Sequence, residues 1–132
     1  MPSSPLPHRV FLADDSPAIR SRVAGMLCAQ VVGEAATPQA CIAGILATHP
    51  DVVVLDVQLE GGQGLEVLLA VRSAEPSIAF VVFSNSSGAA YRKRYLGAGA
   101  ARFLDKSRDF EQLADAVNAA GQHQSTASQD TQ

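Results

Sequence analysis

The stretch Asp51-Val52-Val53-Val54-Leu55-Asp56 decides the fold. Its β-branched and apolar residues follow one another without alternation, which is typical of a strand covered on both faces in a parallel sheet. We therefore expect a central strand over residues 51–55 that ends at Asp56.

On both sides of this strand, apolar runs alternate with helical patterns, as in repeated βα units. The other predicted strands span residues 9–13, 31–35, 78–83 and 101–104. The predicted helices open at Ser16-Pro17 and Thr37-Pro38, span residues 65–74 and 86–96, and open again at Asp109 with Gln112 at the capping-box position. The pattern predicts an α/β fold, (βα)5, with a doubly wound parallel five-stranded sheet. Functional residues of such a sheet lie at the carboxyl ends of its strands.

The length of 132 residues suits one domain. We expect a flexible N-terminus over residues 1–8 and a folded domain over residues 9–121. Residues 122–132 contain no large apolar side chain, which predicts a disordered polar tail.

The composition argues against several classes of protein. Hydrophobic residues make up 47% of the chain and the formal net charge is −3, so a packed core is feasible and no nucleic-acid-binding surface is indicated. No signal peptide or membrane-crossing run is visible, so the expected location is the cytoplasm, without membrane contact. Cys28 and Cys41 lie in apolar, helix-like stretches, and both are expected to be reduced core residues.

Polar groups follow four of the predicted strands: Asp14-Asp15, Asp56, Ser84 and Lys106. Taken alone, a strand-end Asp is more often a turn residue or a helix cap, Ser84 could belong to a turn, and most lysines are solvated. In a parallel sheet, however, these strand ends meet at one crevice. Three carboxylates there repel one another unless a hard cation such as Mg²⁺ lies among them. The cation and Lys106 would neutralise a phosphoryl group during its transfer to a carboxylate, so we predict a phosphoryl-acceptor site.

The same residues carry a resemblance to a known family. The matching features are Asp14-Asp15, Asp56 after Val-Val-Val-Leu, Gly64 eight positions beyond Asp56, Ser84 after Val-Val-Phe, and Phe103 three residues before Lys106. Over residues 9 to 121 the sequence resembles the receiver domain of two-component response regulators, of the stand-alone single-domain type. The resemblance implies the flavodoxin-like receiver fold.

This resemblance also implies roles for the site residues. Asp56 would take a phosphoryl group from a histidine kinase or a histidine phosphotransfer protein, while Lys106 and the Ser84 hydroxyl contact the phosphoryl oxygens. The implied Mg²⁺ ligands are Asp15, Asp56, the backbone carbonyl of Gln58, and Asp14 through water. Such a protein is no enzyme apart from its own phosphotransfer and autodephosphorylation.

The resemblance further implies a switch. On phosphorylation Ser84 would move toward the phosphoryl group and leave space into which Phe103 rotates. This alters the face made by the fourth helix, fifth strand and fifth helix, where a downstream protein partner binds. The basic and aromatic stretch over residues 91–95 on the fourth helix is equally a partner surface or a solvated helix face.

Four positions depart from the common family pattern. Glu60 replaces a proline, which predicts a looser, more acidic loop. Ser107 also replaces a proline. Without proline, a cis bond between Lys106 and Ser107 costs about 3 kcal/mol, so this bond could be cis, as in the family, or trans. If that bond is trans, Lys106 must reach the site by a different backbone path. Phe103 lacks the hydroxyl of the usual tyrosine, and Ser84 lacks the methyl group of the usual threonine.

The sequence argues against two other functions, a phosphatase and a flavodoxin-type cofactor-binding protein. Phosphatases of the haloacid-dehalogenase type need a second aspartate two positions beyond the nucleophile, where this chain has Gln58. A flavodoxin-type phosphate cradle after the first strand would be repelled by Asp14-Asp15. Two alternatives stay open: an interaction module that signals without phosphorylation, and the receiver half of a DNA-binding regulator.

Overall fold

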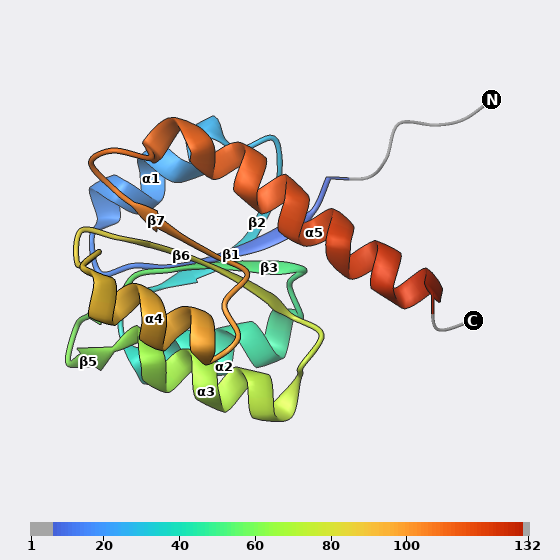
Figure 1. Cartoon of the computed structure of the whole chain (residues 1–132), viewed down its shortest axis with the longest axis horizontal. Coiled ribbons are helices and arrows are strands. Elements are labelled where there is room, and N and C mark those ends of the chain that lie inside the picture. The colour runs from blue at the N-terminus through green and yellow to red at the C-terminus, as the bar shows by residue number, and fades with distance from the viewer. Residues whose placement is uncertain (1–6, 131–132) are drawn as a thin grey trace.

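The fold is described from a computed structural model, which covers residues 7–130, with side chains to Gln122 (Figure 1). Most of the predicted flexible N-terminus lies outside the described residues. The elements of the sheet are β1 (Arg9–Ala13), β2 (Gln30–Ala35), β3 (Val52–Leu55), β6 (Ala79–Ser84) and β7 (Arg102–Asp105). The helices are α1 (Pro17–Met26), α2 (Pro38–Thr48), α3 (Gly64–Ala74), α4 (Ala89–Gly97), the 3₁₀ turn η1 (Phe110–Gln112) and α5 (Leu113–Asp130).

All neighbouring strands of this sheet are parallel, in the order β2-β1-β3-β6-β7. The doubly wound (βα)5 prediction is confirmed. The central position of the 51–55 strand is also confirmed, because β3 pairs with β1 and β6 and its four residues are buried.

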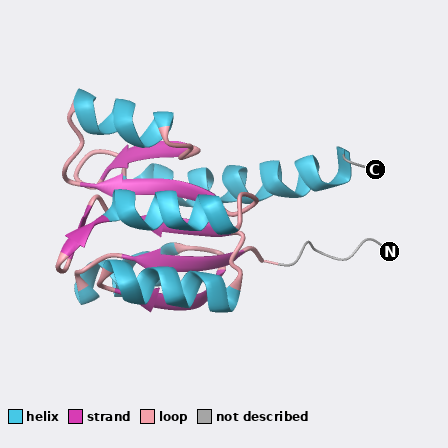
Figure 2. Cartoon of the chain, turned by 90° about the horizontal axis from the view of Figure 1, so that it is seen from below, coloured by secondary structure: helices cyan, strands magenta, loops and turns pink. Residues whose placement is uncertain are grey.

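Helices cover both faces of the sheet (Figures 1 and 2). Helices α1 and α5 pack through Val23, Leu113 and Val117 on one face. Helices α2, α3 and α4 cover the other face, where Ile45 and Leu68 belong to a second apolar cluster. The two predicted caps form as expected: Ser16 accepts from Ile19 N and Thr37 from Ala40 N, each at 3.2 Å.

The structure differs from the sequence predictions after β3. Residues of the expected loop form a small antiparallel hairpin, β4 (Gln58–Leu59) and β5 (Gly62–Gln63), which turns at Glu60 and Gly61. Gly61 has φ +79°, a conformation that glycine adopts without strain. The greater looseness expected of this loop stays a prediction.

The last helix also differs from its prediction. The Asp109 side chain makes no helix cap; its Oδ2 accepts a hydrogen bond from Asp105 N at 2.9 Å instead. Helix α5 continues to Asp130, through most of the predicted disordered tail. No Pro or Gly occurs between Gln122 and Asp130, so a helix already nucleated by its buried first half can propagate. The domain boundary at Gly121 stays a prediction.

The two cysteines differ in their surroundings. Cys41 is buried, and burial raises the pKa of its thiol to about 11, as expected for an inert core residue. The core prediction for Cys28 is wrong, because this residue is exposed at the end of α1. Within the described part of the chain, no helix has the length and apolar character that a bilayer span requires.

Gly64 fixes the start of α3 against the site strand, and its replacement gives a test of this packing. A Cβ at Gly64 would overlap the backbone oxygen of Asp56, so Gly64→Ala should lower the free energy of unfolding by about 1–3 kcal/mol. Urea unfolding measures the change. Gly25→Ala is the matched control, since a Cβ at this helical position meets nothing within 4 Å and should leave stability unchanged or slightly raised. Equal stability of the two variants would contradict the close contact.

Candidate functional site

The parallel register brings the predicted site residues together at one edge of the sheet. Asp14 follows β1, Asp56 follows β3, Ser84 ends β6 and Lys106 follows β7. The Asp56 amide donates to Ala13 O at 2.9 Å, and the Lys106 amide donates to Ser84 O at 3.1 Å. The ladder thus extends one residue beyond each strand and sets the backbone from which the side chains project.

Lys106 lies between two buried carboxylates. Its Nζ is 2.7 Å from Asp14 Oδ2 and 2.8 Å from Asp56 Oδ2, with all three side chains at most 9% exposed. Burial by itself lowers the pKa of Lys106, but the hydrogen bonds and charges of both aspartates outweigh it, and the pKa is raised. Lys106 is therefore an ammonium group. Burial raises the pKa of Asp14, against the opposing hydrogen bonds from Lys106 and Ser16.

The second oxygen of Asp56 is also engaged. Its Oδ1 accepts from the Ser84 hydroxyl at 2.5 Å and from the Gln58 amide at 3.3 Å. The Ser84 oxygen in turn accepts from Ser86 N at 3.1 Å. Asp56 is consequently held on both sides, by a cation on one oxygen and by two donors on the other.

Three carboxylates offer a cation site. Oxygens of Asp14, Asp15 and Asp56 all lie within 4.8 Å of one another. Two oxygens bound to one Mg²⁺ lie at most about 4.2 Å apart, because each Mg–O bond is about 2.1 Å long. Small side-chain rotations would bring these oxygens to that spacing, so the donor set fits Mg²⁺. The structure brings these three predicted residues together, while Gln58 is exposed on the adjacent hairpin.

Comparison with known proteins agrees with this geometry. The family model of the response regulator receiver domain matches residues 10–118. The chain belongs to this family.

Two curated relatives and one solved structure illustrate the likeness. The chain is 35% identical over 116 residues to YxjL, an uncharacterized transcriptional regulatory protein of Bacillus subtilis, covering 85% of this chain and 53% of the relative. It is 32% identical over 117 residues to DevR/DosR, a DNA-binding transcriptional activator of Mycobacterium tuberculosis, covering 86% and 54%. The signal receiver domain of NarL from Mycobacterium tuberculosis superimposes with a TM-score of 0.83 at 34% identity, over 89% of this chain and 98% of that one.

This protein is thus a receiver domain of the two-component response regulators. Receiver domains are signalling modules that interact with histidine kinases and downstream effectors, and they bind Mg²⁺ at an acidic pocket. The chain spans about half the length of the curated relatives it matches, 53% of YxjL and 54% of DevR/DosR.

The Lys106–Ser107 bond of this receiver domain is trans, since residues 7–130 contain no cis peptide bond. The Lys106 ammonium nevertheless lies 2.8 Å from Asp56. Of the two forms that the sequence left open, the structure has the trans form, and the Lys106 side chain reaches Asp56 with this form of the bond.

Phe103 lies inside the domain in this structure. It is 3% exposed, packs edge-on against Tyr95 at a centroid distance of 6.0 Å, and is covered by the Arg92 guanidinium at 5.3 Å. Ser84 already points to Asp56, so both residues have the arrangement that the sequence analysis expected after phosphorylation. The switch itself stays a prediction.

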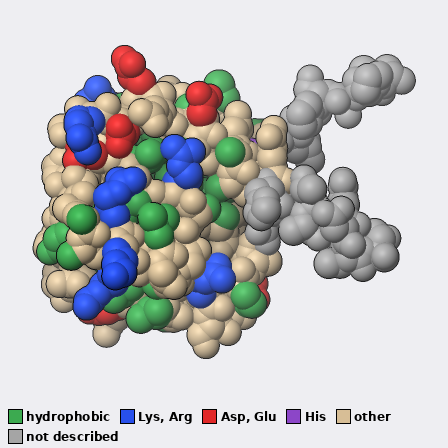
Figure 3. Space-filling model, viewed as in Figure 1, with side chains coloured by type: hydrophobic (Ala, Val, Ile, Leu, Met, Phe, Trp, Pro, Cys, Tyr) green, Lys and Arg blue, Asp and Glu red, His purple; other side chains and the backbone are tan. Residues whose placement is uncertain are grey.

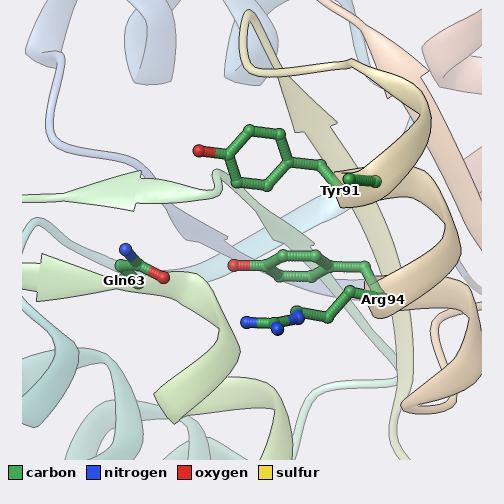
Figure 4. Close-up of a pocket in the computed structure, with 5 residues that line it drawn as sticks. Gln63, Tyr91 and Arg94 are labelled. Carbon is green, nitrogen blue, oxygen red and sulfur yellow. The ribbon is translucent and has the colours of Figure 1, made fainter.

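Tyr95 also lines a hollow of about 150 Å³ beside the hairpin. Figure 4 shows Tyr91 and Arg94 reaching from α4, with Gln63 facing them. Burial raises the pKa of the Tyr95 hydroxyl, and the Leu65 backbone opposes this in part; no hydrogen bond of ordinary geometry reaches the hydroxyl among the described residues. This large side chain packs α4 against Phe103.

Three residues at or beside the site were not assigned to it by the sequence analysis. Arg20 donates to the backbone oxygen of Asp14 at 2.6 Å and pairs with Glu34 at 2.7 Å. Tyr95 buttresses Phe103, and Asp105 holds the turn that contains Lys106. Tyr95 belongs to the 91–95 stretch that the sequence analysis placed on a helix surface, but it is 1% exposed, so that prediction is wrong for this residue. Asp105 also gave a signal in the sequence, namely an acidic residue directly before Lys106.

The Tyr95 hydroxyl gives a test of the packing around Phe103. Tyr95→Phe should leave the free energy of unfolding unchanged or raise it by up to about 1 kcal/mol, because only a weak contact with the Leu65 backbone replaces the hydrogen bonds that this buried hydroxyl makes to water in the unfolded chain. Urea unfolding measures the effect, with Tyr91→Phe as the control at a more exposed ring. A loss of stability in Tyr95→Phe alone would show that the hydroxyl is bonded.

Proposed function

We propose that the domain accepts a phosphoryl group on Asp56, supplied by a histidine kinase or a histidine phosphotransfer protein. The observation that carries this proposal is the Lys106 ammonium held 2.8 Å from the Asp56 carboxylate at the carboxyl edge of the sheet. A fixed cation beside a buried carboxylate is suited to neutralise the oxygens of an incoming phosphoryl group. We propose no reaction beyond this transfer and the later hydrolysis of the acyl phosphate, in which water frees the Asp56 carboxylate and inorganic phosphate leaves. We also propose the cytoplasm as the location.

The transfer exchanges one bond for another. An Asp56 carboxylate oxygen forms a bond to phosphorus while the bond between phosphorus and the donor imidazole nitrogen breaks. The electron pair stays on that nitrogen, and the product on Asp56 is an acyl phosphate. Lys106 and the Ser84 hydroxyl both contact Asp56 now, at 2.8 and 2.5 Å, and each can pass its hydrogen bond to a phosphoryl oxygen.

Bound Mg²⁺ would supply positive charge that neutralises the phosphoryl oxygens during transfer. We propose Asp15, Asp56 and the backbone carbonyl of Gln58 as its ligands, with Asp14 contributing through water. Asp15 is exposed and makes no ion pair among the described residues, so its carboxylate can turn to a metal ion without breaking another contact.

The output surface is proposed to be the face formed by α4, β7 and α5. It carries a hollow of about 380 Å³, a size within the range of binding pockets. Its lining residues are Arg92, Leu96, Ala101, Arg102, Phe103, Leu104, Asp109 and Gln112. Figure 3 shows Lys and Arg side chains over α4 and its surroundings, which favours a protein partner with acidic groups. Phe103 of this hollow pairs with Val82 of β6, two residues before Ser84, which contacts Asp56.

A second candidate is an interaction module that signals without phosphorylation. Its support is that Ser84 and Phe103 already hold the inward arrangement in the unmodified chain. A related proposal, that the domain is the receiver part of a DNA-binding regulator, rests on relatives such as DevR/DosR, of which the chain covers 54%.

Intact mass after incubation with acetyl phosphate and Mg²⁺ tests the acceptor role. The wild type should gain the mass of one phosphoryl group, and Asp56→Asn should gain none because an amide is no nucleophile here. Asp115→Asn, at an exposed position on α5, is the matched control and should react as wild type does. An unlabelled wild type would favour the interaction module, and undiminished labelling of Asp56→Asn would place the acceptor elsewhere.

Replacement of Asp15 tests the proposed metal ligand. Asp15→Asn should weaken Mg²⁺ binding by roughly 10-fold or more, because it removes one charged oxygen ligand from the site. Isothermal titration calorimetry with MgCl2 gives the affinity directly, again with Asp115→Asn as the control. Unchanged affinity in Asp15→Asn would remove this residue from the site.

A further inference from the structure

Asp105 is a buried carboxylate that the proposed transfer does not use. It is the last residue of β7, directly before Lys106, and it is 7% exposed. Its strand partner in the ladder is Ser84. A buried carboxylate costs free energy unless its oxygens are paired, so its contacts show its role.

One oxygen of Asp105 closes the turn that follows Lys106. Its Oδ1 accepts from the Ser107 amide at 2.8 Å, the Ser107 hydroxyl at 2.6 Å and the Arg108 amide at 3.1 Å. The Lys106 amide is fixed separately, by its 3.1 Å hydrogen bond to Ser84 O. The backbone of Lys106 is therefore held on both sides, and these anchors set the direction in which its side chain leaves the turn.

The other oxygen ties this turn to a second loop. Asp105 Oδ2 accepts from the hydroxyl of Ser87, which lies between β6 and α4. The loop that follows Ser84 and the turn that follows Lys106 thus both donate hydrogen bonds to the Asp105 carboxylate. Both residues contact Asp56.

The charge of Asp105 has no cationic partner in the described part of the chain. Lys106 pairs with Asp14 and Asp56, not with its neighbour. Hydrogen bonds from Ser107 and then Ser87 hold the pKa of Asp105 well below its usual value. The carboxylate therefore stays ionised under assay conditions, and it acts as a set of hydrogen-bond acceptors rather than as a counter-ion.

We propose that Asp105 is a positioning residue, which orients Lys106 for phosphoryl transfer to Asp56 through its hydrogen bonds to Ser107 and Arg108. This inference rests on the proposed acceptor function. In the assay with acetyl phosphate, an Asp56 oxygen bonds to phosphorus and acetate leaves with the electron pair of the broken bond. A misplaced Lys106 would slow this step, since a displacement of about 1 Å in a reacting group can cost about 100-fold in rate.

Rates of Asp56 phosphorylation at saturating acetyl phosphate and Mg²⁺ test this role. Asp105→Ala should lower the maximal rate about 10-fold or more, because the turn loses its acceptor. Asp105→Asn should stay within about 1.5-fold of wild type, since its amide oxygen can accept from Ser107 and Arg108 and its amide nitrogen can donate to Ser87. Rescue by the uncharged but hydrogen-bonding variant distinguishes positioning from charge, and Mg²⁺ affinity within about twofold of wild type shows an intact site.

Two results would overturn the inference. One is a wild-type rate in Asp105→Ala; the other is an equal loss in Asp105→Asn and Asp105→Ala. Should Asp105→Ala fail to fold, Ser107→Ala removes one of the hydrogen bonds and should lower the rate about threefold, while an unchanged rate in that variant would overturn the proposal. An unlabelled wild type refutes the acceptor function itself, which keeps the two failures separate.

Discussion

The Lys106 ammonium between Asp14 and Asp56 is the contact on which the functional edge of the sheet depends. Two carboxylates buried beside each other repel, and a buried charge left without its partner costs about 3–5 kcal/mol. The Lys106 ammonium must therefore lie between these two carboxylates, although Lys106 follows β7, which is separated from β3 by β6. The backbone of Lys106 is accordingly held at two points. Its amide donates to Ser84 O of β6, and the turn after it is held by the Asp105 carboxylate. The pairing of β7 with β6 is thus an electrostatic requirement as much as a packing one.

The sequence predicted the parts of this molecule that long apolar runs define. Strand β3 and its neighbours are buried on both faces, so their apolar runs show no alternation with polar residues. In a parallel sheet the carboxyl ends of all strands lie at the same edge, whatever the order of the strands. Asp14, Asp56, Ser84 and Lys106 could be placed together for this reason. Short elements gave no such signal. The hairpin over residues 58–63 has strands of only two residues each, too short to give a periodic pattern in the sequence.

Competition between hydrogen bonds explains other differences. Asp109 has the sequence context of a helix cap, yet its carboxylate accepts from Asp105 N in the preceding turn.

Packing explains the position of Phe103. This ring packs edge-on against Tyr95, which lies eight positions earlier on α4. A resemblance drawn from the site residues alone contains no information about this neighbour. Local rules predict what a residue can bind, and only the fold decides which partner is within reach.

The same rule connects the site residues to their turns. At four strand ends a side-chain oxygen accepts from the amide two residues later: Asp14 from Ser16, Asp56 from Gln58, Ser84 from Ser86, and Asp105 from Ser107. Such short polar side chains favour turns because they mimic a backbone acceptor. A carboxylate has oxygens to spare, so the turn and the site can share one residue. Asp14 and Asp56 give their second oxygen to Lys106, while Asp105 gives its own to Ser87. The turn reading and the functional reading of a strand-end aspartate are therefore compatible, and at Asp14 and Asp56 the turn holds the carboxylate in the position from which it meets the cation.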